Sequence, residues 1–149
     1  MENSRKRKAG HEFQERVSTL KLELQPLFPL PQGKPHESFP KSLLAFHLLT
    51  EKEMDDMARY YHQSEHSEYT YEYPECMNWD AQWLSSLPQA ERCKIKKRKI
   101  GKFIGLRGCD TPSHEYTQRI RFLEQQMEKK VKRAIEEEDA KQKVGFMRW

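Results

Sequence analysis

The chain has 149 residues, of which 36% are apolar and 34% charged, and its formal net charge at pH 7 is +4. This length suits a single domain, and with so few apolar residues a core forms only if they cluster. Three widely separated cysteines argue against a disulfide framework, no apolar stretch approaches the roughly 18 residues of a membrane helix, and no secretory signal is recognisable, so we expect a soluble intracellular protein with no membrane partner.

A polar, basic arm opens the chain. Residues 1–10 are expected to be disordered. Four consecutive basic side chains within the arm are typical of a nuclear import signal or of a nucleic-acid contact: Arg5, Lys6, Arg7 and Lys8.

A short amphipathic segment follows at residues 11–24. Phe13, Val17, Leu20 and Leu24 recur at the spacing of one helix face. Residues 20–24 also alternate as a short strand would; we favour the helix. Five of the eight prolines then fall between residues 25 and 40, which predicts either a proline-rich linker over residues 25–38 or an extended segment that lies along the rest of the chain.

The clearest helix start is the sequence Thr50-Glu-Lys-Glu53. A threonine at the N-cap with a glutamate three residues later is a capping box, in which each side chain bonds the backbone amide of the other residue. An apolar stripe follows at helical spacing and predicts a helix over about 51–64; it comprises Met54, Met57, Ala58 and Tyr61.

Three further helices are expected. Residues 80–87 predict a short helix, preceded at residues 68–73 by a short extended segment that places Tyr69, Tyr71 and Tyr73 on one side. Pro88 suits the first turn of a second helix, which should end near Gly105 or Gly108. Residues 112–143 predict a long C-terminal helix, with too few clean heptads to insist on a coiled coil. Its apolar stripe, which we expect to pack on the rest of the chain, comprises Tyr116, Ile120, Leu123 and Met127.

The predicted fold class is therefore mainly α: a compact helical core with one short extended aromatic segment and a long C-terminal helix. The predicted organisation is a disordered basic arm (1–10), a short amphipathic segment (11–24), a proline-rich linker (25–38), a helical core (39–109), and the long C-terminal helix and tail (110–149).

The strongest functional signal is a basic block at residues 92–107, which has eight Lys or Arg and no acidic residue. A helix that docks by its apolar residues and presents lysines outward would bind phosphates. The residues predicted to contact nucleic acid, DNA or RNA, are Lys94, Lys96, Lys97, Arg98, Lys99, Lys102 and Arg107.

The competing interpretation is internal pairing. Residues 51–80 carry nine acidic residues against two basic ones, and this acidic block can neutralise the basic block within the molecule. Simple solvation of the lysines is the third interpretation.

Aromatic residues interleave the acidic block, and the acidic charge argues against base stacking there. We expect them to form a core or a protein-binding surface. The candidate partner-binding residues are Tyr69, Tyr71, Tyr73, Trp79 and Trp83.

Sites for chemistry are weakly signalled. His62 and His66 have a usable zinc spacing, but no Cys-x-x-Cys motif exists, and exposed histidines are the simpler interpretation. Cys109 follows a basic stretch and has His114 nearby, yet no orienting third group is evident. We expect no catalytic residues, no metal and no cofactor.

Two stretches, FPKSLLAFHLLT at residues 39–50 continuing to YYHQ at 60–63, and KIGKFIGLRGC at 99–109, resemble a group of small uncharacterised fungal proteins. The resemblance implies no fold, activity or ligand, but it favours residues 39–109 as the structural unit.

Together these observations predict a non-enzymatic nuclear module that contacts nucleic acid or chromatin through a basic helix. The alternative is an adaptor, nuclear or cytoplasmic, that binds another protein or a second copy of itself through the acidic–aromatic segment and the long C-terminal helix.

Overall fold

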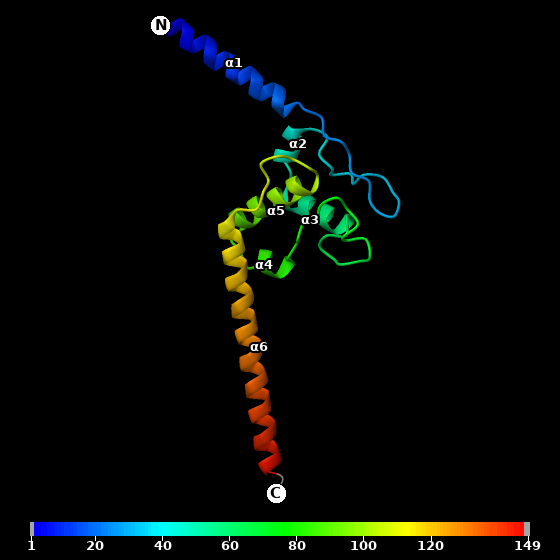
Figure 1. Cartoon of the computed structure of the whole chain (residues 1–149), viewed down its shortest axis with the longest axis vertical. Coiled ribbons are helices and arrows are strands. Elements are labelled where there is room, and N and C mark those ends of the chain that lie inside the picture. The colour runs from blue at the N-terminus through cyan, green and yellow to red at the C-terminus, as the bar shows by residue number, and fades with distance from the viewer. Residues whose placement is uncertain (1, 148–149) are drawn as a thin grey trace. The chain divides into compact units, whose positions relative to one another are not determined.

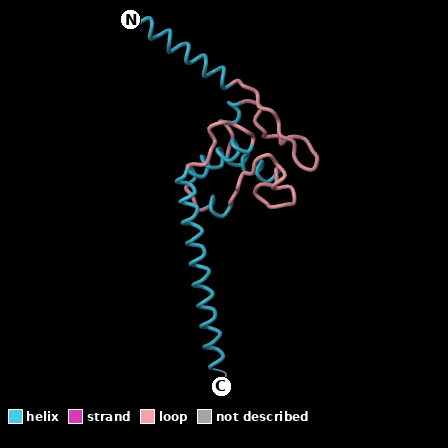
Figure 2. Tube along the Cα trace, viewed as in Figure 1, coloured by secondary structure: helices cyan, strands magenta, loops and turns pink. Residues whose placement is uncertain are grey.

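The computed structural model describes residues 2–147, and side chains are described for residues 4–145. Helices and loops make up this part of the chain, with no strand in it (Figure 2). The predicted mainly α architecture is therefore confirmed. The helices are α1 (Glu2–Leu20), α2 (Leu43–His47), α3 (Glu51–Tyr60), α4 (Ala81–Ser85), α5 (Gln89–Phe103) and α6 (Ser113–Met147).

The chain divides between Asp110 and Thr111 into two units. The first unit contains α1 to α5, and the second is the long helix α6 with its tail.

The hydrophobic core of the first unit is built around α3 and α5, which pack side by side (Figure 1). The predicted stripe of α3 is fully buried, since Met54, Met57, Ala58 and Tyr61 are each at most 1% exposed. Burial of these side chains is the main stabilising contribution to the unit. The neighbouring helices add Phe46, Trp83, Leu84, Ile95, Ile100 and Phe103.

The predicted capping box at the start of α3 is present. The Thr50 hydroxyl oxygen accepts from the Glu53 amide at 3.3 Å, and the Glu53 carboxylate accepts from the Thr50 amide at 3.3 Å. The helix ends at Tyr60, short of the predicted residue 64, because the backbone turns at His62, where φ is +58°.

The predicted glycine stop of α5 is also present. Gly105 adopts φ +89°, a left-handed conformation that disfavours any residue with a side chain. The Leu106 amide donates to the Gly101 carbonyl at 2.8 Å, and the Gly105 amide donates to the Lys102 carbonyl at 3.1 Å. These two bonds form a Schellman cap, so α5 ends as the glycine pattern predicted.

The structure differs from expectation near the N-terminus. Residues 2–10, predicted as a disordered arm, form the first turns of α1, in line with the helical propensity of their Glu, Arg, Lys and Ala residues. α1 ends at Leu20, and residues 22–24 then pair with residues 41–43 through an isolated antiparallel bridge. The helix interpretation therefore holds up to Leu20, and the strand interpretation holds for the bridged residues 22–24.

The proline-rich segment 25–38 is hydrogen-bonded to the core, as the alternative of a draped extended segment expected. The Leu30 amide donates to the Tyr73 hydroxyl at 2.8 Å, and the Tyr61 hydroxyl donates to the Leu27 carbonyl at 2.7 Å. Proline-rich backbone forms few hydrogen bonds of its own, so tyrosine hydroxyls from distant parts of the chain satisfy it.

The aromatic segment is wrongly predicted as extended: residues 68–75 form turns and bends. The buried Gln63 amide organises them by donating to the Thr70 carbonyl at 2.9 Å and accepting from the Met77 amide at 2.9 Å. The tyrosines do not share a side, because Tyr71 is 72% exposed while Tyr73 is 5% exposed.

The second unit, α6, is close to its predicted length. No helix in the described residues is long and apolar enough to cross a membrane. The side chains of the predicted α6 stripe are 44% to 66% exposed, and their packing on the first unit stays a prediction. Two more exposed apolar residues extend this stripe, so that the α6 stripe comprises Tyr116, Ile120, Leu123, Met127, Val131 and Ile135.

Candidate functional site

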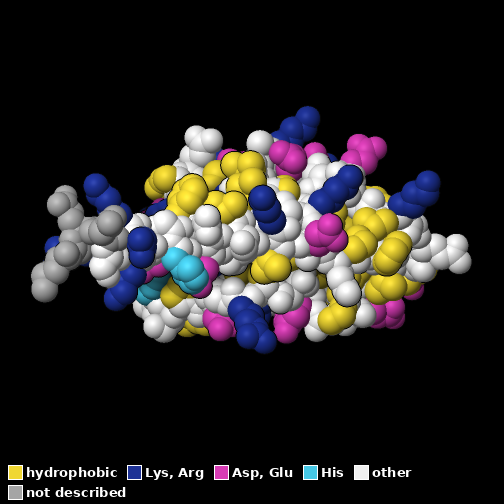
Figure 3. Space-filling model, turned by 90° about the horizontal axis from the view of Figure 1, so that it is seen from above, with side chains coloured by type: hydrophobic (Ala, Val, Ile, Leu, Met, Phe, Trp, Pro, Cys, Tyr) yellow, Lys and Arg dark blue, Asp and Glu magenta, His cyan; other side chains and the backbone are white. Residues whose placement is uncertain are grey.

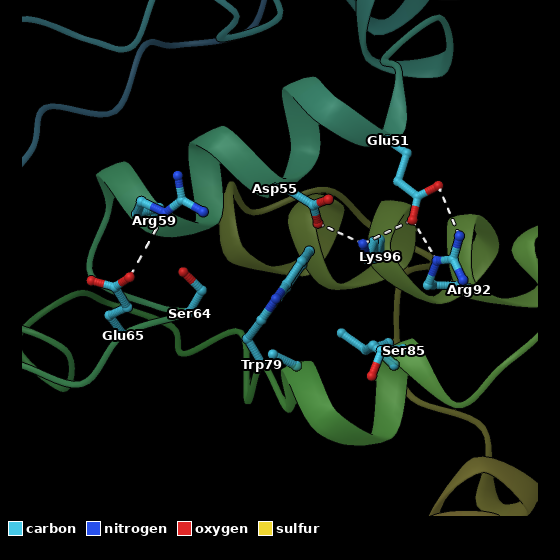
Figure 4. Close-up of a pocket in the computed structure, with 11 residues that line it drawn as sticks. Glu51, Asp55, Arg59, Ser64, Glu65, Trp79, Ser85, Arg92 and Lys96 are labelled. Carbon is cyan, nitrogen blue, oxygen red and sulfur yellow. Dashed lines mark hydrogen bonds and ion pairs between the residues drawn. The ribbon is translucent and has the colours of Figure 1, made fainter.

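Four charged side chains join α3 to α5, and we call them the ion-pair cluster: Glu51, Asp55, Arg92 and Lys96 (Figure 4). Each helix contributes two residues four positions apart, which places them on one face. Lys96 Nζ lies 3.0 Å from Glu51 Oε1 and 2.5 Å from Asp55 Oδ1. Arg92 binds Glu51 through two nitrogens, with its Nη2 3.3 Å from Oε2. The acidic and basic blocks of the sequence therefore pair directly here.

Glu51 is the hub of the cluster. Hydrogen bonds from Arg92, and next from Lys96, lower the pKa of Glu51 from 4.5 to about 2. The carboxylate is thus fully ionised at neutral pH, and it has no proton to offer as a general acid.

A cavity of about 450 Å³ opens beside the cluster. Trp79 forms one wall, with Lys96 Nζ 5.6 Å from its ring centroid, and Arg59 pairs with Glu65 at 3.8 Å (Figure 4). The charged residues of the lining are balanced, with three acids and three bases. Its two serines have no histidine beside them in the lining.

Two of the lysines predicted to contact nucleic acid are buried. Lys96 is 6% exposed and bound in the cluster. Lys99 is 8% exposed, and its ammonium donates to the Met77 and Asn78 carbonyls at 3.4 and 3.2 Å. Their outward orientation was wrongly predicted, because the face of α5 that carries Ile100 and Phe103 also carries both lysines.

The remaining basic residues of α5 and its following loop differ in exposure. Lys94 and Arg107 are exposed, while Lys97, Arg98 and Lys102 are half-buried. Lys97 also donates to the His47 carbonyl at 2.7 Å. Over most of the face drawn in Figure 3, Lys and Arg side chains stand apart, with acidic and apolar groups between them.

The aromatic candidates are mostly structural. Tyr73, Trp79 and Trp83 are buried, in agreement with the core alternative for these residues. Tyr69 is half-buried, and Tyr71 is the exposed member of the predicted set. Turns after α3 return the chain to the core, which the alternating sequence pattern did not indicate.

Cys93 and Cys109 lack the environment of a reactive thiol. Burial raises the pKa of Cys109, and burial together with the Glu51 carboxylate raises the pKa of Cys93. Cys109 Sγ instead packs on Gly101, where an added Cβ would approach it to 2.5 Å. Among the described residues, no group of three His, Cys, Asp or Glu side chains is placed to hold a metal ion. His62 Nε2 lies 3.0 Å from the Leu30 carbonyl, and His66 stacks on Tyr71.

The basic arm lies on α1. Arg5, Lys6, Arg7 and Lys8 are all exposed, and the import role of this arm stays a prediction.

The α6 stripe is a candidate binding surface on the helix that the alternative interpretation of the sequence already named. Its helical spacing was visible in the sequence, but that spacing predicted packing on the core and gave no sign that these side chains are exposed.

No protein-family model matches the chain, and no curated protein or solved structure is significantly similar to it.

Proposed function

We propose that this protein is an interaction module that binds a helical partner along the α6 stripe. The observation that carries the proposal is the exposure of six apolar side chains on one face of α6, each between 44% and 66%. The opposite face is polar and includes Gln125, Lys129, Lys132 and Glu136, all exposed. An amphipathic helix of this kind gains most of its stability when the apolar face is packed.

The size of the surface fits a helical partner. The α6 stripe runs from residue 116 to residue 135, about 30 Å at a rise of about 1.5 Å per residue. Contiguous apolar surfaces of this extent on a monomer mark interaction sites.

The test uses the double variant Ile120→Glu/Val131→Glu, which places two carboxylates in the α6 stripe. We expect proteins cross-linked to the tagged full-length chain in cell extract to be recovered at least about tenfold less with this variant, because each charge would be buried unpaired. Gln125→Glu, which adds a carboxylate on the polar face, is the control and should recover partners like the native chain. Equal recovery by all three chains would remove the proposal.

The second candidate function is nuclear nucleic-acid contact. The exposed basic arm of α1 and the exposed Lys94 and Arg107 favour it, whereas the buried Lys96 and Lys99 take no part. These residues would bind phosphates by counterion release.

Its test is titration of a fluorescent DNA or RNA duplex at about 50 and 200 mM salt. We expect Lys94→Gln/Arg107→Gln to lower the salt slope by about 1 for each phosphate contact removed. The control is Lys52→Gln, an exposed lysine on the acidic helix α3. Binding that does not depend on salt, or a salt slope that is the same for the native chain and both variants, would contradict this candidate function.

A further inference from the structure

The spacing of the α6 stripe defines the kind of helix that covers it. Two pairs of stripe positions are separated by 11 residues: Tyr116 and Met127, and Ile120 and Val131. An 11-residue repeat corresponds to about 3.67 residues per turn, close to the 3.6 of a straight helix. The stripe therefore runs almost along the helix axis, and it matches a nearly straight helix with the same repeat.

A second copy of α6 supplies such a helix. In a parallel pair in register, each apolar side chain of the stripe meets its own counterpart over the full length from residue 116 to residue 135. Every exposed apolar residue of the stripe is then covered by an apolar residue.

The charges beside the stripe select the orientation. Glu124 and Glu128 lie on one flank of the stripe, and Lys130 lies on the other. In an antiparallel pair whose two apolar stripes face each other, the acidic flank of one helix lies beside the acidic flank of the other. Glu124 of one chain then approaches Glu128 of the second chain. In a parallel pair the acidic flank faces the flank with Lys130, and opposite charges meet.

We infer that the chain forms a parallel homodimer through α6, with a nearly straight or slightly right-handed pair of helices. This inference rests on the proposed function and names the partner as a second copy of the chain. A parallel pair brings the two C-terminal ends of α6 together.

Sedimentation equilibrium of the full-length chain tests the inference. We expect the mass to rise with concentration from 17.9 kDa towards twice that value. Ile120→Glu/Val131→Glu should weaken association more than about 100-fold, and Gln125→Glu should leave it unchanged. Circular dichroism of each variant checks that α1 to α5 remain folded.

Orientation is read by mixing chains that carry donor and acceptor fluorophores fused at the C-terminus. Strong energy transfer is expected for the parallel pair, and a dimer without transfer between two C-terminal fluorophores would overturn the orientation. A native chain that stays at 17.9 kDa at every concentration overturns self-association. If the stripe variant then still loses cross-linked proteins, the partner is a foreign helix and the proposed function stands; if it loses none, both fail.

Discussion

Replacing Trp83 with alanine is expected to lower the free energy of unfolding by about 3–5 kcal/mol, the usual cost of removing a large buried aromatic side chain. Trp83 is 2% exposed and belongs to the core formed with α3 and α5. The sequence pattern equally allowed it to be a partner contact. Urea unfolding followed by circular dichroism at neutral pH measures the loss.

Tyr71→Ala is the matched control, because Tyr71 was predicted for the same surface and is 72% exposed. Its free energy of unfolding should stay within about 0.5 kcal/mol of the native value. A Trp83→Ala protein of native stability would contradict the burial of this side chain and restore it as a partner contact. Trp83→Phe keeps part of the packing, so its free energy of unfolding should lie between those of Trp83→Ala and the native protein.

Local signals predicted the start of α3 and the end of α5 correctly. The capping box at Thr50 and the glycine stop at Gly105 depend on a few neighbouring residues, whose chemistry is set whatever the rest of the chain does. The short helix after Asp80 follows the same logic, since the Asp80 carboxylate accepts from the Trp83 amide at 3.1 Å. Such features are readable from sequence because they need no distant partner.

Predictions that depended on distant partners did less well. Lys96 and Lys99 sit one turn from Ile100 and Phe103, so spacing alone placed them near the core face, but their charge suggested solvent. A lysine can bury its aliphatic stem when hydrogen-bond acceptors lie within reach of its ammonium group. Those acceptors, Glu51 and the Met77 carbonyl, are 45 and 22 residues away in the chain.

The sequence did not decide between a linker and a draped segment for residues 25–38, for the same reason. Nothing within residues 25–38 indicates that tyrosine hydroxyls will bind its backbone, since Tyr73 lies 43 residues beyond Leu30. Conversely, the α6 stripe obeys the local rule for a buried face and is exposed. Periodicity identifies a face of a helix, and only the assembled structure says what covers it.

Substituting Glu51 with glutamine is expected to lower the free energy of unfolding by about 2–3 kcal/mol at pH 7. The reason is the folded-state pKa of about 2 against 4.5 for the free carboxyl, since each pKa unit corresponds to about 1.4 kcal/mol of preference for the ionised form. The Glu51 side chain is 22% exposed, so solvent reduces this value only in part.

The sign of the pH dependence follows from the lowered pKa. The stabilisation by ionised Glu51 is fully present above the unfolded pKa of 4.5 and is lost as the pH falls towards about 2. The difference between native and Glu51→Gln proteins should therefore shrink between about pH 5 and pH 2. Glu75→Gln, an exposed control carboxylate, should run parallel to the native curve. If the difference in free energy of unfolding between the native and Glu51→Gln proteins is constant over this pH range, the stabilisation does not come from the ion pairs of Glu51.

The double variant Glu51→Gln/Lys96→Met separates the charge pair from packing. Lys96→Met keeps the buried stem of Lys96 and removes the charge that would otherwise lose one of its two carboxylate partners. The double variant should therefore be less destabilised than the sum of the single variants by about 1–2 kcal/mol. Strict additivity would mean that the two residues act independently, and the pairing of the acidic and basic blocks would then contribute little to the fold. A clear coupling energy instead means that Lys96 serves stability, which leaves the exposed basic residues as the ones able to contact phosphate.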